Sequence, residues 1–531
     1  MTAQATARAA TGATSRSTVP AQAPVPRRTP RRLESSAAAS RVAIVALAAC
    51  AARLRWDRFG ASGLYLDDAW VAISTRVNGL NDLLRIGSSS PGFVLFLARP
   101  WTFLFGSSTT SLQLLPFVLG VIAPPLCFVV ARAWKIRFGP AVLAGALLAV
   151  SPIHRMYSAN FKQYTAEAIA SLLLLWGGSF VVAEPGDRRR WIWLVVGCIA
   201  ATVFSMSETI VALGVLSGAA LATAQRDQAK IPRVAVVAIE SYLLVAVAWY
   251  AVALRPHLNS ALYTFWHAKF IHLGNGFATV PRQVFARLQS LLAGFSGLDP
   301  RLMMVMIAAA AVALLLGRPA LGIAVIVPTG LALVLALGEV APIGTGRTDI
   351  YLYPTFALLL SAGIDQIVRA LPRRTAGPTG LATAAIAGLI LARTQPGLTP
   401  YVSENMRPLV QRLEREKRSG DTTIIYPLAS FSYGLYTRSA VHIRADEAFP
   451  MSFFVQPDDP RSFVLPMDRT HPSRYAHSID IMTRGQHRVW LIGTHFWSDW
   501  SVIRSLMTQR GFRVALDQAA TGSLLILYTR P

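Results

Sequence analysis

Residues 117–130 read FVLGVIAPPLCFVV, and residues 131–137 read ARAWKIR, so an apolar run ends in a basic cluster. Such a run is typical of a membrane-spanning helix, and Arg and Lys beside it are typical of a cytoplasmic loop. Similar runs recur along the 531 residues, of which 53% are hydrophobic and 15% charged, with a mean hydropathy of +0.44. Soluble proteins average about a quarter charged residues. We therefore predict a mainly α-helical, polytopic membrane protein.

The formal net charge of +24 comes almost wholly from arginine, because the chain has only five lysines. This hydropathy excludes a nucleic-acid-binding protein, so we interpret the charge as a topology signal and a match for anionic membrane lipids. The three cysteines lie inside apolar runs and show neither metal-ligand spacing nor a disulfide pattern. Residues 1–40 are rich in Ala, Thr, Pro and Arg, which predicts a disordered, basic cytoplasmic tail.

The segment Pro91–Phe105 decides the topology. It is apolar and aromatic, but it is shorter than the roughly 20 residues that a span needs. If it crossed, the basic cluster after Val130 would face outward, against the positive-inside rule. We therefore expect an interfacial helix in a first external loop, 55–111.

On this count, residues 41–393 form a membrane domain of about eleven spans that begins in the cytoplasm. A competing interpretation is a cleaved signal peptide, since residues 47–50 (LAAC) resemble a lipoprotein cleavage site, but the region before them is long for that class. The predicted spans are Val42–Leu54, Phe117–Val130, Pro140–Val150, Ala168–Val182, Trp191–Phe204, Ile210–Ala224, Val234–Leu254, Leu302–Leu316, Leu321–Leu337, Ile350–Ile367 and Leu381–Leu391.

Residues 394–531 have a different character, because charged residues return and short alternating runs appear. We predict a small extracytoplasmic α/β domain that acts as a lid or acceptor-docking module. Its predicted strands are Thr422–Tyr426, Arg488–Ile492, Phe512–Leu516 and Ser523–Tyr528, and its predicted helix is Ser501–Gln509.

Residues 64–70, LYLDDAW, place two adjacent carboxylates, Asp67 and Asp68, just beyond the first span. Adjacent carboxylates against a bilayer are costly, so they indicate a functional site. The alternative is that the pair only caps a helix, since Asp is a favoured N-cap residue.

Three further features are predicted to lie on the same external side as the acidic pair. They are the loop Ser151–Glu167, a tight turn at Glu208, and the segment Gly344–Pro354. Together they bring cations, carboxylates and tyrosines beside the pair, which suits acid/base chemistry next to a phosphate leaving group. The alternative is that the cations are ordinary interface anchors and the tyrosines an aromatic belt.

The order of these features resembles the GT-C superfamily of glycosyltransferases, which includes the aminoarabinose transferase of lipid A and the protein O-mannosyltransferases. In that family an acidic pair follows the first span, and a short helix then opens with a Pro motif and ends in Phe-Gly, as residues 90–92 and 105–106 do here. A family run Tyr-Ser-x-Glu-x-Arg-x-Tyr is matched by residues 157–164, YSANFKQY. A basic residue ahead of Tyr and Pro is matched by Arg347, Tyr351 and Pro354.

The resemblance covers about residues 40–370 and implies a membrane glycosyltransferase with a polyprenyl-phosphate-linked sugar donor. It implies an acceptor hydroxyl on a glycan, lipid or protein, and transfer with inversion at the anomeric carbon. Asp67 would be the catalytic base with Asp68 beside it, and Lys162, Arg347 or Arg155 would hold the donor phosphate. The other predicted substrate-binding residues are Tyr157, Tyr164, Glu167, Glu208 and Tyr351.

Two departures from the family pattern affect the donor site. Relatives place His or Lys before the Pro of the interfacial helix, whereas residues 88–90 are all Ser here, so we expect that phosphate contact from Arg76 or Arg85. Asn160 replaces the usual acid and Lys162 replaces Arg, which removes a bidentate phosphate fork.

No nucleotide-binding Gly-x-x-x-x-Gly-Lys-Ser/Thr run is present. We predict no certain cofactor, although the acidic pair with Glu167 is a possible divalent-metal site. The main alternative function is a lipid or glycan flippase, which predicts an internal repeat and ionisable residues in the middle of spans. The sequence shows no repeat, and its ionisable residues gather at external ends. A second alternative is a non-catalytic membrane scaffold.

Overall fold

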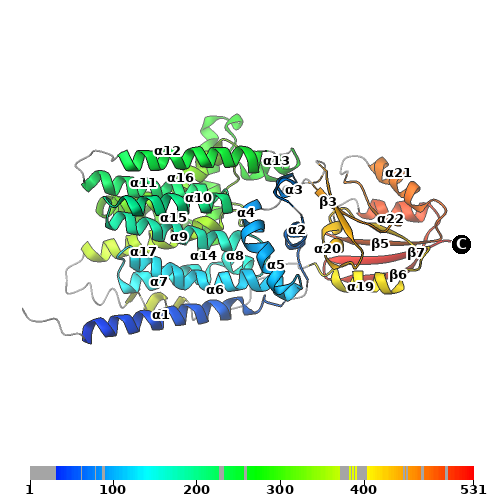
Figure 1. Ribbon diagram of the computed structural model, residues 1–531, viewed down its shortest axis with the longest axis horizontal. Coiled ribbons are helices and arrows are strands. Elements are labelled where there is room, and N and C mark those ends of the chain that lie inside the picture. The colour runs from blue at the N-terminus through cyan, green and yellow to red at the C-terminus, as the bar shows by residue number, and fades with distance from the viewer. Residues whose placement is uncertain are drawn as a thin grey trace, which may run out of the picture. The chain divides into compact units, whose positions relative to one another are not determined.

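The structure is a computed structural model (Figure 1). The chain divides into two units, residues 1–42 and residues 43–531, and the candidate site lies entirely in the second unit. Most of the predicted tail, 1–40, lies outside the described residues, as do residues 381, 384, 388 and 391 of the last predicted span, Leu381–Leu391. The structure describes residues 31–60, 63–77, 79–85, 90–226, 233–255, 260–370, 382–383, 385–387, 389–390, 404–446, 449, 453–467, 472–496 and 500–531.

Eight of the described helices are long and apolar enough to cross a membrane. Eight of the predicted spans coincide with them, so the polytopic helical fold is confirmed. Two other predicted spans fall in shorter helices, α7 (Phe138–Val150) and α10 (Arg188–Phe204), and the total of eleven stays a prediction. The eight are α1 (Arg31–Trp56), α6 (Thr109–Ala133), α9 (Tyr164–Ala183), α11 (Glu208–Arg226), α12 (Arg233–Trp249) with η2 (Tyr250–Leu254), α15 (Pro300–Gly317), α16 (Pro319–Leu337), and η7 (Ile350–Leu352) with α17 (Tyr353–Ala370).

Small residues let the spans pack closely. A Cβ on Gly218 of α11 would lie 2.5 Å from the Ala320 carbonyl oxygen of α16, and one on Gly214 would lie 2.5 Å from Pro328. In lipid, helices associate through such close packing, because the surrounding tails are as apolar as the side chains. These glycines therefore set the separation between α11 and α16.

Short helices form a layer at one end of the spans, which we call the short-helix layer. The loop predicted to be the first external one contributes α2 (Leu66–Ser74), α3 (Leu80–Arg85) and a continuous helical segment of α4 (Pro91–Phe93), η1 (Val94–Ala98) and α5 (Arg99–Phe105). This last segment is the predicted interfacial helix, and it exposes apolar side chains, with Phe103 87% exposed. Later loops add α8 (Pro152–Tyr157), α13 (Ser260–Trp266), η4 (His267–Lys269), η5 (Leu273–Asn275), η6 (Phe277–Thr279) and α14 (Val280–Ser296).

The C-terminal region is the predicted α/β domain, drawn in yellow to red in Figure 1. A five-stranded sheet has the order β4-β1-β5-β7-β6, in which β4, β1 and β5 are parallel and β7 runs antiparallel to β5 and β6. The four predicted strands and the predicted helix are confirmed, whereas β2, β3 and β4 were not predicted. The elements are α19 (Arg407–Glu416), β1 (Thr422–Ile425), α20 (Ala429–Tyr436), β2 (Val441–Ala445), β3 (Phe453–Pro457), β4 (Ser462–Val464), α21 (Pro472–Thr483), β5 (Arg488–Thr494), α22 (Trp500–Gln509), β6 (Arg513–Ala520) and β7 (Ser523–Thr529).

The described buried apolar residues form two clusters. One fills the helix bundle and includes Leu148, Leu175 and Phe356. The other joins the short-helix layer to the C-terminal domain, with Val71 of α2 and Phe431 of α20 among its members. The helix that carries the acidic pair therefore shares its core with the C-terminal domain.

Candidate active site

The acidic pair lies in the first turn of α2. Tyr65 precedes the helix with an extended backbone, and its N–H donates to Asp68 Oδ2 at 3.1 Å. The Asn160 amide donates to the same oxygen at 3.2 Å. Asp68 therefore performs the capping role that one interpretation assigned to the pair, and this contact turns Asp67 toward the helix bundle.

Asp67 faces two cations from distant parts of the chain. Arg347 Nη1 lies 2.9 Å from Asp67 Oδ2, and Lys162 Nζ lies 3.8 Å from the same oxygen. Burial by itself raises the pKa of Asp67, but the charges of Lys162, Arg347 and His495 outweigh it, so the net shift is downward. Asp67 is therefore held as an ionised carboxylate.

Asp68 has the opposite electrostatic character. Burial and then the negative charge of Asp67 raise the pKa of Asp68 to about 7, despite the hydrogen bonds from Tyr65 and Asn160. Its Oδ1 is buried, and no group among the described residues hydrogen-bonds to it. The pKa values of the two adjacent carboxyls are thus shifted in opposite directions, which is typical of an acid/base site.

Lys162 is the more deeply buried cation. Its side chain is 3% exposed, and its ammonium lies 3.8 Å from the centroid of the Trp70 ring. Burial lowers the pKa of Lys162 to about 8, although Asp67 pulls it upward. The same chain segment brings the edge-to-face pair Tyr157 and Tyr164, with centroids 4.8 Å apart.

Arg347 projects from a loop that Asp349 organises. Asp349 Oδ2 accepts hydrogen bonds from the backbone N–H of Thr345 at 2.7 Å and of Gly346 at 3.2 Å. The Arg347 guanidinium also stacks on an aromatic pair from α13, 5.3 Å from the Phe265 ring and 4.7 Å from the Trp266 ring. The loop and this aromatic pair together direct the guanidinium toward Asp67.

Two buried glutamates, Glu167 and Glu208, lie at the starts of α9 and α11 and accept hydrogen bonds from serines. Glu167 Oε1 accepts from Ser205 Oγ at 2.6 Å and from Ser207 Oγ at 3.0 Å. Ser171 Oγ lies 3.1 Å from Glu208 Oε2 and 2.9 Å from the carbonyl oxygen of Tyr351. These contacts join helices, and the predicted substrate-binding role of Glu167, Glu208 and Tyr351 remains a prediction.

The remaining predicted phosphate ligands lie in other surroundings. Arg155 Nε donates to the Leu54 carbonyl oxygen at 3.3 Å, and burial lowers the pKa of Arg155. Arg76 donates to backbone carbonyls of α20, while the side chain of Arg85 and residues 88–89 lie outside the described residues. Lys162 and Arg347 are thus the two predicted cations with a contact to the acidic pair.

The metal prediction gains no support. In the part of the chain that the structure describes, no three His, Cys, Asp or Glu side chains are grouped to hold a metal ion. Asp67 already has two cationic partners, so a divalent ion would have to displace them.

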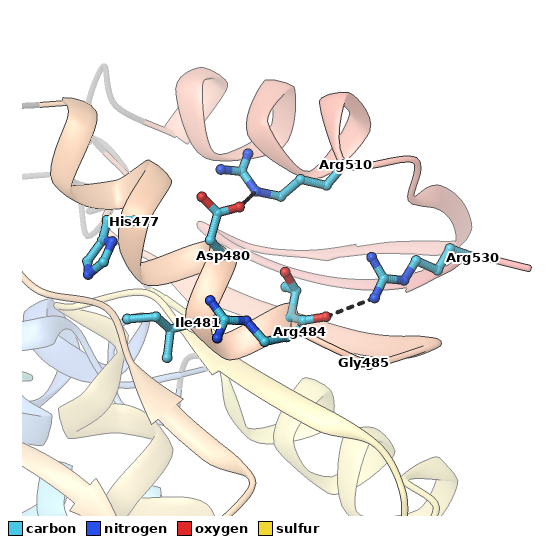
Figure 2. Close-up of a pocket in the computed structure, with 8 residues that line it drawn as sticks. His477, Asp480, Ile481, Arg484, Gly485, Arg510 and Arg530 are labelled. Carbon is cyan, nitrogen blue, oxygen red and sulfur yellow. Dashed lines mark hydrogen bonds and ion pairs between the residues drawn. The ribbon is translucent and has the colours of Figure 1, made fainter.

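A pocket of about 410 Å³ opens in the C-terminal domain beside α21 and α22 (Figure 2). Arg510 Nε donates to Asp480 Oδ1 at 2.6 Å, and Arg530 donates to the Thr483 carbonyl oxygen at 3.1 Å. These arginines join α21 to its neighbours, and none of the predicted site residues lines the pocket. Its lining is His477, Asp480, Ile481, Thr483, Arg484, Gly485, Arg510 and Arg530.

Several residues of the site carry no recognisable sequence signal. Phe265 and Trp266 lie in the short helix α13, in a stretch of ordinary composition, and Asp349 lies in the predicted segment Gly344–Pro354 without a signal of its own. His495, whose charge acts on Asp67, follows a strand of the C-terminal domain as a lone histidine. Only their spatial neighbours identify them.

No protein-family model and no curated protein sequence matches the chain. Solved structures do match. The crystal structure of ArnT from Cupriavidus metallidurans bound to undecaprenyl phosphate has a TM-score of 0.52 and 13% identity, over 92% of this chain and 97% of that chain. The archaeal oligosaccharyltransferase AglB from Archaeoglobus fulgidus, in complex with an inhibitory peptide and a dolichol-phosphate, has a TM-score of 0.51 and 10% identity, over 92% and 74%.

Both of these proteins are GT-C glycosyltransferases, and this chain has their fold. The expected architecture, a multi-pass helical membrane domain followed by a C-terminal α/β domain, is confirmed.

Proposed function

We propose that the protein is a membrane glycosyltransferase that moves a sugar from a polyprenyl-phosphate-linked donor to an acceptor hydroxyl. The observation that carries this proposal is the Asp67 carboxylate held between Lys162 and Arg347. The fold adds support, since the ArnT structure has undecaprenyl phosphate bound and the AglB structure is a complex with a dolichol-phosphate.

In the proposed mechanism Asp67 is the catalytic base. The acceptor hydroxyl gives its proton to Asp67 while its oxygen bonds to the anomeric carbon. The bond from that carbon to the phosphate oxygen breaks, and its electron pair leaves on the polyprenyl phosphate. Because attack and departure occur on opposite faces, the anomeric configuration inverts.

Lys162 and Arg347 have two tasks in this mechanism. With no donor present, they keep Asp67 ionised. When the donor binds, its phosphate shares these cations, so their pull on Asp67 weakens and the carboxylate becomes a stronger base. The same cations then stabilise the charge that develops on the leaving phosphate.

Asp68 supports this base without touching the reacting atoms in the proposal. Its contacts with Tyr65 and Asn160 fix the first turn of α2. Because its pKa is raised to about 7, it adds less negative charge beside Asp67 than a fully ionised neighbour would.

The proposed topology places the N-terminus in the cytoplasm and the C-terminal domain outside, beside a glycan, lipid or protein acceptor. The exposed apolar residues of the interfacial helix, among them Phe96 and Phe103, support contact with membrane lipid near the donor.

The test is incubation of the protein, purified in lipid nanodiscs, with a panel of polyprenyl-phosphate sugars and extracts of cell-envelope acceptors. We expect one donor to be consumed with release of free polyprenyl phosphate, and the anomeric configuration of the product to be inverted. A parallel assay in sealed vesicles follows movement of intact donor across the bilayer. Movement without release of polyprenyl phosphate would contradict the proposal and favour a flippase.

A further inference from the structure

The helix that carries the acidic pair packs on the C-terminal domain. Leu66, Val71 and Ile73 of α2 are at most 5% exposed and belong to the buried cluster that fills this domain. A Cβ on Gly434 of α20 would lie 3.8 Å from Ile73 Cδ1, so the two helices touch. Figure 1 shows α2 beside α20.

The start of α2 is held by a close backbone contact. Gly63 has φ +93°, and a Cβ there would lie 2.3 Å from the Glu404 carbonyl oxygen. The Glu404 carboxylate is buried, and its Oε1 lies 2.7 Å from His495 Nδ1. The His495 ring in turn packs edge-to-face on the Tyr65 ring, with centroids 5.4 Å apart.

His495 has an unusual backbone for this contact. Its φ is +54°, in the left-handed region that residues other than glycine rarely adopt. Such conformations persist where surrounding contacts enforce them, and they gather at functional sites. The strained residue, His495, is therefore the one whose side chain contacts both Glu404 and Tyr65.

The end of α2 is fixed to the same domain. Arg76 Nη1 donates to the Gly434 carbonyl oxygen at 3.0 Å, and its Nη2 donates to the Leu435 carbonyl oxygen at 3.3 Å. These are the last carbonyls of α20, where a cation also complements the helix dipole. Both ends of α2 are therefore attached to the C-terminal domain.

We infer that the C-terminal domain is a positioning element of the active site, in which His495 and Glu404 clamp the start of α2, and α20 clamps its end through Arg76. The clamp holds Asp67 where Lys162 and Arg347 reach it. This inference rests on the proposed glycosyltransferase function for its catalytic consequence. It makes His495 a positioning residue and gives the domain a role beyond that of a lid or docking module.

The clamp also has an electrostatic consequence. The charged groups that act on Asp67 are Lys162, Arg347 and His495, with Asp68 adjacent in the helix. Of these, His495 alone comes from the C-terminal domain. A change at His495 therefore affects the basicity of Asp67 as well as its placement.

The sharpest test compares Gly63→Ala with Gly60→Ala in the full-length protein. Both glycines have positive φ, +93° and +77°, so both variants bear backbone strain, but a Cβ on Gly60 meets nothing within 4 Å. We expect Gly63→Ala to lower kcat by about 10²-fold, because small displacements of a catalytic group have that effect. We expect the donor KM to stay within about threefold, because displacing the base slows the chemical step and contributes little to donor affinity.

A second comparison uses His495→Gln with His487→Gln as its control. His487 lies in the same domain, exposed, with its Nδ1 against the carbonyl oxygen of Pro531. In His495→Gln the acid limb of the kcat/KM profile should move to higher pH, because Asp67 loses a nearby positive charge. A residue with a merely structural role would not move that limb.

Hydrogen exchange tests the clamp without any activity. We expect the amides of residues 66–74 to exchange about tenfold faster in Gly63→Ala and His495→Gln than in their controls, while peptides from the helix bundle keep their protection. If Gly63→Ala fails to insert, His495→Gln decides the outcome. Unchanged exchange in α2 together with unchanged kcat would overturn the inference. If the wild-type protein consumes no donor, the proposed function fails, and the exchange result still decides the clamp.

Discussion

Replacing Lys162 by Met removes the positive charge that acts most strongly on Asp67, with little change in side-chain length. Arg347 is closer to the carboxylate, at 2.9 Å against 3.8 Å, but its side chain is 22% exposed and that of Lys162 only 3%. Water therefore screens Arg347 more, and burial decides the order of the two effects on the pKa of Asp67.

The size of the effect follows from this contact. One opposite charge within this distance shifts a carboxyl pKa by about 1–3 units. Because Arg347 and His495 remain, we expect a rise of about 1 unit in the pKa of Asp67, or ~1.4 kcal/mol. Asp67 works only when ionised, so activity falls as pH drops through its pKa. Loss of the cation raises that pKa, and the acid limb of kcat/KM moves about 1 unit to higher pH.

Lys162→Met should also lower kcat by about 10²–10³-fold, because one group that stabilises the leaving phosphate is lost. The assay is release of polyprenyl phosphate across the full pH profile. The control is Lys417→Met, whose ammonium pairs with Asp459 in the C-terminal domain. An acid limb that stays at its wild-type pH would refute the electrostatic link between Lys162 and Asp67, even if kcat falls.

Three further expectations concern the cations and the loop that holds Arg347. Wild-type activity should fall as pH rises through about 8, where buried Lys162 loses its proton, and Lys162→Arg should move this alkaline limb to higher pH in the same assay. Asp349→Ala should lower kcat by about tenfold, since losing the acceptor for the Thr345 and Gly346 N–H groups costs about 1–3 kcal/mol and releases the loop; a wild-type circular dichroism spectrum would exclude unfolding. Arg155→Gln should lower the free energy of unfolding by ~1 kcal/mol, the contribution of its hydrogen bond to the Leu54 carbonyl, and so lower the thermal midpoint. The donor KM should stay unchanged. A raised KM would show instead that Arg155 holds phosphate.

Much of the site could be predicted from the sequence, because the side of the membrane that a loop faces can be predicted without knowing any interatomic distance. Apolar runs separated by short basic loops alternate in direction, which places Asp67, Lys162 and Arg347 on one face of the membrane. Asp67 and Arg347 are 280 residues apart, yet the structure brings them to 2.9 Å. The residue types then indicate the kind of reaction, since a carboxylate near two cations suits a phosphate leaving group.

The packing of α2 against the C-terminal domain could not be predicted from the sequence. Its apolar residues read as part of a loop in the membrane domain, but they lie in the core that it shares with the C-terminal domain. The contact between Arg76 and Gly434 spans 358 positions, and no pattern in either segment refers to the other. Arg76 was accordingly predicted to contact phosphate, whereas its guanidinium binds the end of α20.

Side-chain direction explains the different surroundings of Arg155 and Lys162. Both are cations in the same loop, and no feature of the sequence distinguishes them as phosphate ligands. The short helix α8 carries Arg155 toward the Leu54 carbonyl at the end of α1, while the turn after it carries Lys162 onto Trp70 and Asp67. Such orientations depend on the local backbone, which composition and spacing do not specify.

Transfer by the Asp67→Asn variant is the most direct test of Asp67 as the catalytic base. Asn keeps the shape of the side chain but cannot accept the acceptor's proton as a carboxylate does. Asp82→Asn, an exposed change in α3 of the same external loop, is the matched control. We predict that Asp67→Asn inserts normally, binds the donor and releases no polyprenyl phosphate, while Asp82→Asn retains wild-type turnover. Full turnover by Asp67→Asn would contradict the central claim.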